Sequence, residues 1–432
     1  MITFEHMGLV DGVIRDTKIP KFVKVKQLFS VKREDDISGC IRSGMAERDL
    51  YERIKPGMRV AITVGSRQIA NMSAIVKELG DICKERGATP YLFPSMGSHG
   101  GGTAEGQAAF LHHYGITEES MGAEINACMD VTDIGTISDG THVFVASHLL
   151  DADAIIIMNR IKAHPGFSGP IESGLTKMAV IGFGKRVGAE SMHRIGTQGM
   201  SGRLIEAAAV IFDKLKVAIG VGVIENAYDE TAEIHCIPAE CIPAEEPPLL
   251  LRAKSYMPKI IPNPLDVLIV DRIGKNISGM GADPCITCRF TSPHKSGDRP
   301  GPARMVFRDL TDETENAASG MGQADIITRR LFDKIDIGKT YVNQITSTFI
   351  ENDIIPLIMP NDRDAIKVAI KTCHCEDPLA PRIVRIKNTL MIGELYASEA
   401  LIPEIEANPE LEIVGEPFEF EFDEEGYFKY EM

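Results

Sequence analysis

The chain has 432 residues, which is too long for one ordinary hydrophobic core, so we expect two domains or three. Hydrophobic residues make up 44% and charged residues 25% of it, a composition typical of folded proteins in water, and no apolar run reaches the length of a membrane span, about 20 residues. A formal net charge of −16 excludes a general nucleic-acid surface, because binding to phosphate needs basic patches.

The first residues, MITFEHMGLVDG, lack the basic and apolar regions of a secretory leader, so we expect a cytoplasmic protein. Nine cysteines, an odd number, argue against a disulfide framework in such a protein. Two pairs lie close in sequence, Cys285 with Cys288 and Cys373 with Cys375. Together with His374, these cysteines could form a zinc or iron–sulfur site, so this hypothesis stays open. The spacing of CHC, however, is not that of a zinc knuckle.

The N-terminal half alternates β-branched runs with amphipathic patterns. Apolar runs that end in glycine or polar loops predict strands at 58–66, 89–95, 142–149, 152–160 and 216–224. Apolar residues at three- and four-residue steps predict helices over 71–87 and 201–216. Continuous apolar strands between helices are typical of a buried, largely parallel sheet. We therefore expect an α/β domain over residues 1–255.

Proline density rises after this domain, and the pentapeptide CIPAE occurs twice in tandem. Because proline restricts its own backbone and that of the preceding residue, we expect a semi-rigid connector over 236–264. Strand and helix patterns resume at 265–274, 353–373 and 382–395, before an acidic tail. The pattern predicts a second α/β domain over 265–432.

Histidines follow two of the expected strands inside glycine-rich loops. His99 lies in SMGSHGGG, and His164 opens HPGFSGPIESGLTK. Glycine lets the backbone approach a bound group without interference from Cβ, and strand-to-helix turns of this kind present N–H groups to anions. Since ligands collect at the carboxyl ends of parallel strands, we expect both histidines at one site.

The order of five residues resembles the nickel-pincer-nucleotide-dependent lactate racemase family. The segment VGSR ends at Arg67, His99 and His164 follow in their glycine-rich loops, and Lys177 closes HPGFSGPIESGLTK. His193 follows Lys177 by sixteen residues. The chain thus resembles a homologue of lactate racemase, and its sequence does not indicate which substrate it uses.

The resemblance implies an active-site cleft between two α/β domains, with the cofactor held by residues 1–255. The cofactor would be nickel with pyridinium-3,5-bisthiocarboxylic acid mononucleotide, the nickel-pincer nucleotide, attached covalently to a lysine. Lys177 would carry it, with Lys185 as the alternative, and His193 would complete a planar nickel site, a geometry that suits nickel(II). Contacts to the nucleotide or to an anion would come from Gly65, Ser66 and Arg67.

The resemblance further implies an isomerase, a racemase or epimerase that moves hydride between Cα of an α-hydroxy acid and the nickel-pincer nucleotide. His99 and His164 would act as the two catalytic bases, since a neutral imidazole accepts a proton near pH 7. The family's C-terminal Gln/Lys pair for the substrate carboxylate has no counterpart here. In its place, the turn DRIGKNISGMGADP favours a substrate other than lactate. Its candidate substrate-binding residues are Lys275, Asn276 and Ser278.

The implied partners are a small α-hydroxy acid and cofactor-maturation enzymes, with neither nucleic acid nor membrane, while a homo-oligomer stays open. Two other functions also stay open. One is a zinc or iron–sulfur binding protein that uses the CxxC and CHC clusters. The other is a nickel-free nucleotide-dependent enzyme in which Lys177 and Arg67 bind phosphate.

Overall fold

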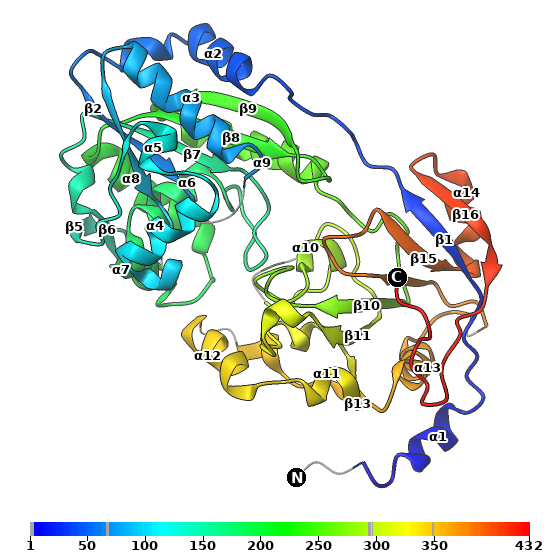
Figure 1. Ribbon diagram of the computed structural model, residues 1–432. Helices are drawn as coiled ribbons and strands as arrows, with labels where there is room; N and C mark the ends of the chain where they lie inside the picture. Colours follow the sequence, from blue (N-terminus) through cyan, green and yellow to red (C-terminus); the bar gives the residue numbers. More distant parts are fainter. Residues whose placement is uncertain are drawn as a thin grey trace. The chain divides into compact units, whose positions relative to one another are not determined.

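The computed structural model describes residues 4–65, 69–97, 99–292, 295, 297–347, 350–377 and 379–432. The chain forms two compact units, one of Ser30–Met257 and one of Met1–Phe29 with Pro258–Met432. Each unit alternates strands with helices around a sheet whose pairings are mostly parallel, so the α/β fold class is confirmed (Figure 1). Within the described residues, no helix has both the length and the apolar character that crossing a membrane requires.

A six-stranded sheet forms the centre of the unit Ser30–Met257, in the order β4-β3-β2-β7-β8-β9. Its strands are β2 (Arg59–Val64), β3 (Thr89–Pro94), β4 (Glu124–Ile125), β7 (Ala154–Arg160), β8 (Val217–Glu225) and β9 (Thr231–Pro238). All neighbours are parallel except β8 and β9. The expected strand at 142–149 is β6 (His142–Ala146), which pairs with β5 (Val131–Thr136) in a separate two-stranded sheet.

Helices cover both faces of this sheet, as its continuous apolar strands require. Successive side chains of a strand point to opposite faces, and Ile155, Ile156 and Ile157 of β7 are all fully buried. The core on one face includes α2 (Ile37–Glu47) and α3 (Met72–Glu85), and the core on the other includes α8 (Met200–Lys214). The remaining helices of four or more described residues are η1 (Leu50–Arg53), α4 (Ala104–His113), α5 (Glu118–Met121), the π-helix η4 (Met178–Gly182), α7 (Lys185–His193) and α9 (Ile242–Tyr256).

The strand order reverses between β2 and β7. From β2 the chain proceeds to β3 and β4 on one side, whereas from β7 it proceeds to β8 on the other. The loops that leave β2 and β7 therefore diverge. In open parallel sheets such a point leaves a crevice at the carboxyl ends of the strands, where ligands bind.

The second unit contains an eight-stranded sheet in the order β13-β12-β11-β10-β14-β15-β1-β16. Its strands are β1 (Phe22–Gln27), β10 (Val267–Ile273), β11 (Arg304–Leu310), β12 (Ile326–Thr328), β13 (Leu357–Met359), β14 (Ile383–Ile386), β15 (Glu394–Ser398) and β16 (Leu411–Phe418). Strands β10 to β14 are parallel, and the rest are antiparallel. Helices here include α1 (Gly8–Ile14), α10 (Pro284–Thr287), α11 (Arg329–Asp333), α12 (Ile337–Ser347), α13 (Asp362–Thr372) and α14 (Ile402–Ala407).

The sequence-based boundaries differ from this division at two places. Strand β1 lies between β15 and β16, so residues 1–29 belong to the second unit and not to the domain expected over 1–255. The expected connector over 236–264 instead begins inside β9 and then forms α9. Proline is favoured in the first turn of a helix, and Pro243 lies there in α9, so part of the proline cluster marks a helix start.

A closed network of buried charges joins three strands of the second unit. Arg308 of β11 and Arg385 of β14 are each 1% exposed, and both pair with Asp271 of β10. Arg308 also binds Asp362, at 2.7 Å, and Glu431 near the C-terminus, at 3.2 Å. The network therefore matches each buried cation with carboxylates.

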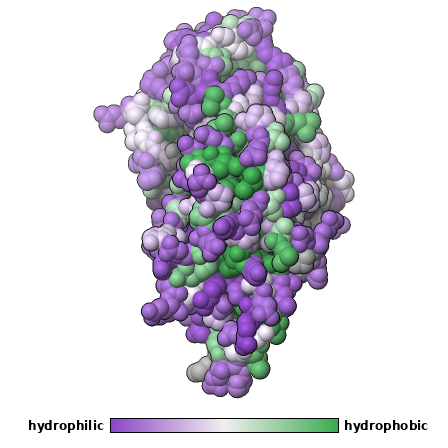
Figure 2. Space-filling view, turned by 90° about the vertical axis from the view of Figure 1, so that its right-hand side faces the viewer, coloured by the Kyte–Doolittle hydropathy of each residue, from purple (hydrophilic) through white to green (hydrophobic). Residues whose placement is uncertain are grey.

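The surface carries little continuous apolar area on the face that Figure 2 draws. Hydrophilic residues cover most of it, and hydrophobic residues gather in a few separate patches. Separate hydrophobic patches on the surface are normal in folded proteins. The surface pattern on this face therefore does not by itself indicate a binding site.

Candidate active site

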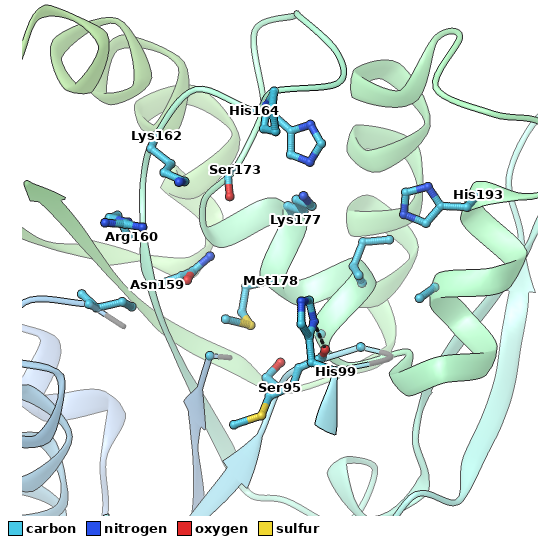
Figure 3. Close-up of a pocket in the computed structure, with 18 residues that line it drawn as sticks. Ser95, His99, Asn159, Arg160, Lys162, His164, Ser173, Lys177, Met178 and His193 are labelled. Carbon is cyan, nitrogen blue, oxygen red and sulfur yellow. Dashed lines mark hydrogen bonds between the residues drawn. The ribbon is translucent and has the colours of Figure 1, made fainter. Parts of the chain in front are cut away.

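A cavity of about 280 Å³ opens at the switch point of the six-stranded sheet, within the unit Ser30–Met257. Its walls come from residues that end or follow β2, β3 and β7, and from the segment between β7 and α8. Five candidate residues line it: Gly65, His99, His164, Lys177 and His193. In Figure 3 the side chains of His164, Lys177 and His193 point into one space. The structure thus gathers residues that are far apart in sequence.

The other candidate residues lie elsewhere. Ser66 and Arg67 are outside the described residues. Lys275, Asn276 and Ser278 belong to the second unit, in the turn that follows β10. There the backbone N–H of Lys275 donates to Thr314, and the Asn276 side chain accepts from Thr311 at 2.6 Å. This turn occupies the carboxyl end of its own sheet, the position that parallel sheets use for ligands.

The chain after β7 turns back on itself and so brings Lys177 to the strand end. Lys162 and Ser173 form an antiparallel bridge, with N–O distances of 2.9 and 3.1 Å. Gly174 follows, and a Cβ there would lie 1.9 Å from Oε1 of Glu246. Only glycine fits at this position without displacing Glu246. The short helix α6 (Leu175–Lys177) then places Lys177 in the cavity wall.

Two carboxylates under the cavity fix this segment at both ends. The N–H of His164 donates to Glu172 at 2.7 Å, and Lys254 donates to the other oxygen of Glu172 at 2.6 Å. The N–H of Thr176, next to Lys177, donates to Glu246 at 3.0 Å. Because Lys254 and Glu246 both come from α9, this helix positions the cavity wall.

The two candidate bases carry their protons on different ring nitrogens. In His99, Nδ1–H donates to the carbonyl of Met96 at 2.9 Å, so Nε2 of the neutral ring carries the lone pair. In His164, Nδ1 accepts from the N–H of Gly166 at 3.0 Å, so Nε2 of the neutral ring carries the proton. The ring of His164 also stacks on Phe167, with 4.3 Å between centroids. Together the two rings present one acceptor and one donor nitrogen.

His193 lies at the C-terminal end of α7 and lines the same cavity. Burial, with the positive charges of Lys177 and Arg203 nearby, lowers its pKa to about 4. The imidazole is therefore neutral at pH 7. A neutral imidazole keeps a nitrogen lone pair, which is the form that binds a metal ion.

Lys185, the alternative to Lys177, does not line the cavity and is fully buried. Its Nζ donates to the carbonyl of Pro94 at 2.8 Å and to Oε1 of Gln107 at 3.0 Å. Burial lowers its pKa to about 7, and the two N–H groups of a neutral amine match these two acceptors. Gln107 in turn donates to the carbonyls of Gly97 and His99. Lys185 thus anchors the loop that carries His99.

The positioning residues Gln107, Glu172, Glu246 and Lys254 carry no signal that sequence reasoning could isolate. Each is an ordinary polar residue in a helical or loop pattern, and α9 came from the segment we expected to be a connector. Burial is what distinguishes Gln107, Glu172 and Glu246. Only the three-dimensional structure gives that information.

The structure provides no support for a metal site at the cysteine clusters in the residues that it describes. In the described ranges, no group of three or more His, Cys, Asp or Glu side chains is arranged to hold a metal ion. Cys373 is buried, and its thiol donates to the carbonyl of Ile370 at 3.1 Å. The zinc or iron–sulfur alternative therefore has no geometric support in this part of the chain.

Comparisons with known proteins point to the same unit and to one fold. The family model "Domain of unknown function (DUF362)" matches residues 54–238, which include every residue that lines the cavity. No curated protein sequence matches the chain. The solved structure of the lactate racemase apoprotein from Thermoanaerobacterium thermosaccharolyticum is similar at a TM-score of 0.53 and 12% identity, over 86% of this chain and 99% of that one. The chain therefore has a lactate-racemase-like fold.

Proposed function

We propose that the protein is a racemase or epimerase of an α-hydroxy acid that works with a nickel-pincer nucleotide. The observation that carries the proposal is the placement of His99, His164, Lys177 and His193 around one cavity. A structural role would not require three imidazoles and an amine from four separate segments to face the same space. The lactate-racemase-like fold supports the same chemistry.

The donor set fits this cofactor. Lys177 supplies an amine for the covalent link, and His193 supplies a neutral imidazole for nickel(II), which binds nitrogen donors well. Both residues line the cavity and point into one space (Figure 3). When bound, the nickel-pincer nucleotide would supply an acceptor for the hydride that leaves Cα. Lys177 and His193 would hold it.

The two remaining histidines would then move the hydroxyl proton. For one stereoisomer, Nε2 of His99 accepts this proton while Nε2–H of His164 donates a hydrogen bond to the substrate. Loss of one hydride and one proton turns the alcohol into a ketone, and their return restores the hydroxy acid. No outside oxidant or reductant is consumed. For the other stereoisomer, an exchange of these roles would require His164 to carry its proton on Nδ1 and so to lose the hydrogen bond from Gly166.

The test is an isotope experiment on protein produced together with cofactor-maturation enzymes. A panel of small α-hydroxy acids carries deuterium at Cα, and the product stereoisomer is analysed by mass. Hydride transfer predicts that the label remains at Cα in ordinary water, because the same hydride returns. His99→Ala and His164→Ala each remove one proton-transfer group and should lower turnover by about 10²- to 10⁴-fold with the cofactor retained.

Two results would contradict the proposal. Loss of the label to water would indicate proton abstraction at Cα. Full activity in Lys177→Ala would show that Lys177 does not carry a covalent link that the reaction needs.

A further inference from the structure

The cavity is basic in an acidic protein. Its charged lining residues, among those described, are Arg160, Lys162 and Lys177, and no Asp or Glu belongs to the lining. The chain as a whole has a formal charge of −16. A lining that contains basic side chains and no carboxylate favours the binding of an anion.

Arg160 forms an ion pair within the protein that uses only one of its nitrogen atoms. Its Nη1 pairs with Glu225, whose side chain is 6% exposed and whose other oxygen accepts from the N–H of Ala70 at 2.8 Å. In the described part of the chain, Nε and Nη2 of Arg160 make no hydrogen bond. Glu225 therefore holds one nitrogen of the guanidinium, and Nε and Nη2 remain as donors on a residue that lines the cavity.

Lys162 and Ser173 add an ammonium group and a hydroxyl group to the end of the cavity that Arg160 lines. Their backbones form the antiparallel bridge, and both side chains line the cavity. The Ser173 hydroxyl makes no hydrogen bond within the described residues. Figure 3 places Arg160 and Lys162 on the opposite side of Lys177 from His193. The cavity thus has a cationic end separate from the end that would hold nickel.

We infer that Arg160, Lys162 and Ser173 form an oxyanion subsite for a carboxylate or a phosphate monoester. Its ligand rests on the proposed function: the group is either the carboxylate of the hydroxy acid or the phosphate of the nucleotide. The subsite itself rests on the cationic lining and the hydroxyl.

The experiment uses the apoprotein, so that it does not depend on cofactor loading. The thermal unfolding midpoint is followed against inorganic phosphate and, separately, against lactate, with sodium chloride at matched ionic strength as the reference. Lys162→Met keeps the side-chain length and removes the charge, and Ser173→Ala removes the hydroxyl. Arg160 stays intact because its loss would leave Glu225 unpaired. The control is Lys216→Met, an exposed lysine that lies just before β8, at the opposite end of the strands.

Lys162→Met should weaken binding of the effective anion by about tenfold, and Lys216→Met should leave it unchanged. A phosphate effect identifies the nucleotide end, and a lactate effect identifies the substrate carboxylate; either supports the subsite. Equal binding by wild type, Lys162→Met, Ser173→Ala and Lys216→Met, or no binding of either anion, overturns it. Nickel and adduct analysis of the loaded protein tests the proposed function independently.

Discussion

Basic side chains have different surroundings in the two units. In the second unit, Arg308 and Arg385 are buried and meet Asp271, Asp362 and Glu431 in a closed network, with the Phe428 ring 3.7 Å from one guanidinium carbon and 4.5 Å from the other. In the first unit, basic side chains line a cavity that has no lining carboxylate among the described residues.

The contrast distinguishes structural charges from functional ones. A buried cation whose partners are all within the protein contributes to one packed arrangement, and its removal leaves buried carboxylates behind. A cation that lines a cavity can meet a ligand as well as the protein, and a cationic lining favours an anionic ligand. We therefore expect substitutions in the network to change stability, and substitutions at the cavity to change binding and turnover.

The largest stability effect is expected at the network. Arg308→Met leaves Asp362 and Glu431 without this partner and should lower the free energy of unfolding by about 3–5 kcal/mol. Denaturant unfolding of the apoprotein measures it. Arg363→Met, at a long ion pair of 3.8 Å with Asp364 whose arginine is 42% exposed, is the control and should cost at most about 1 kcal/mol. Equal losses in both variants would remove the contrast between buried and exposed charge.

A smaller effect is expected where α9 supports the cavity wall. Glu246→Ala removes the acceptor for Thr176 and should cost about 1–3 kcal/mol. Because Lys177 follows Thr176, we also expect a lower fraction of loaded protein by intact mass. The neighbouring Glu245→Ala breaks a partly exposed pair with Arg48 and should change neither quantity much. If the two variants load the cofactor equally, α9 does not position Lys177.

The smallest effect per step of the experiment is a pH dependence of stability from Lys185. Its pKa is about 7 in the folded protein and about 10.5 when unfolded, so between these values the unfolded chain binds more protons. Stability of the wild type should therefore rise with pH in this window, by at most about 1.4 kcal/mol per pH unit, relative to Lys185→Met. Unfolding curves at pH 6, 7.5 and 9 measure it. Parallel curves for the two proteins would contradict the neutral amine.

Much of the fold could be predicted from the sequence, because the spacing of apolar residues follows which side chains of a strand or helix are buried. The run at 152–160 becomes β7, and the patterns at 71–87 and 201–216 become α3 and α8. The position of β1 could not be predicted, because strand pairing between residues 22–27 and 394–418 is a long-range choice that no local pattern encodes. Proline density was misleading at α9, where a helix start and a connector share the same composition.

Histidines in glycine-rich loops after strands were predictable as a group, since topology brings such loops together. The distinction between Lys177 and Lys185 was not, because both follow glycine-rich stretches in sequence. Burial separates them: one lines the cavity, and the other is enclosed between β3 and α4. The anchoring role of Glu172 likewise depends on contacts with Lys254, far along the chain.

The central claim is tested most directly by nickel content with intact mass and peptide mapping, on protein produced with cofactor-maturation enzymes that load a known family member. Our account predicts one nickel per chain and a covalent adduct on Lys177, both absent in Lys177→Ala. Neither nickel nor adduct under these conditions, or an adduct that persists in Lys177→Ala, would contradict it.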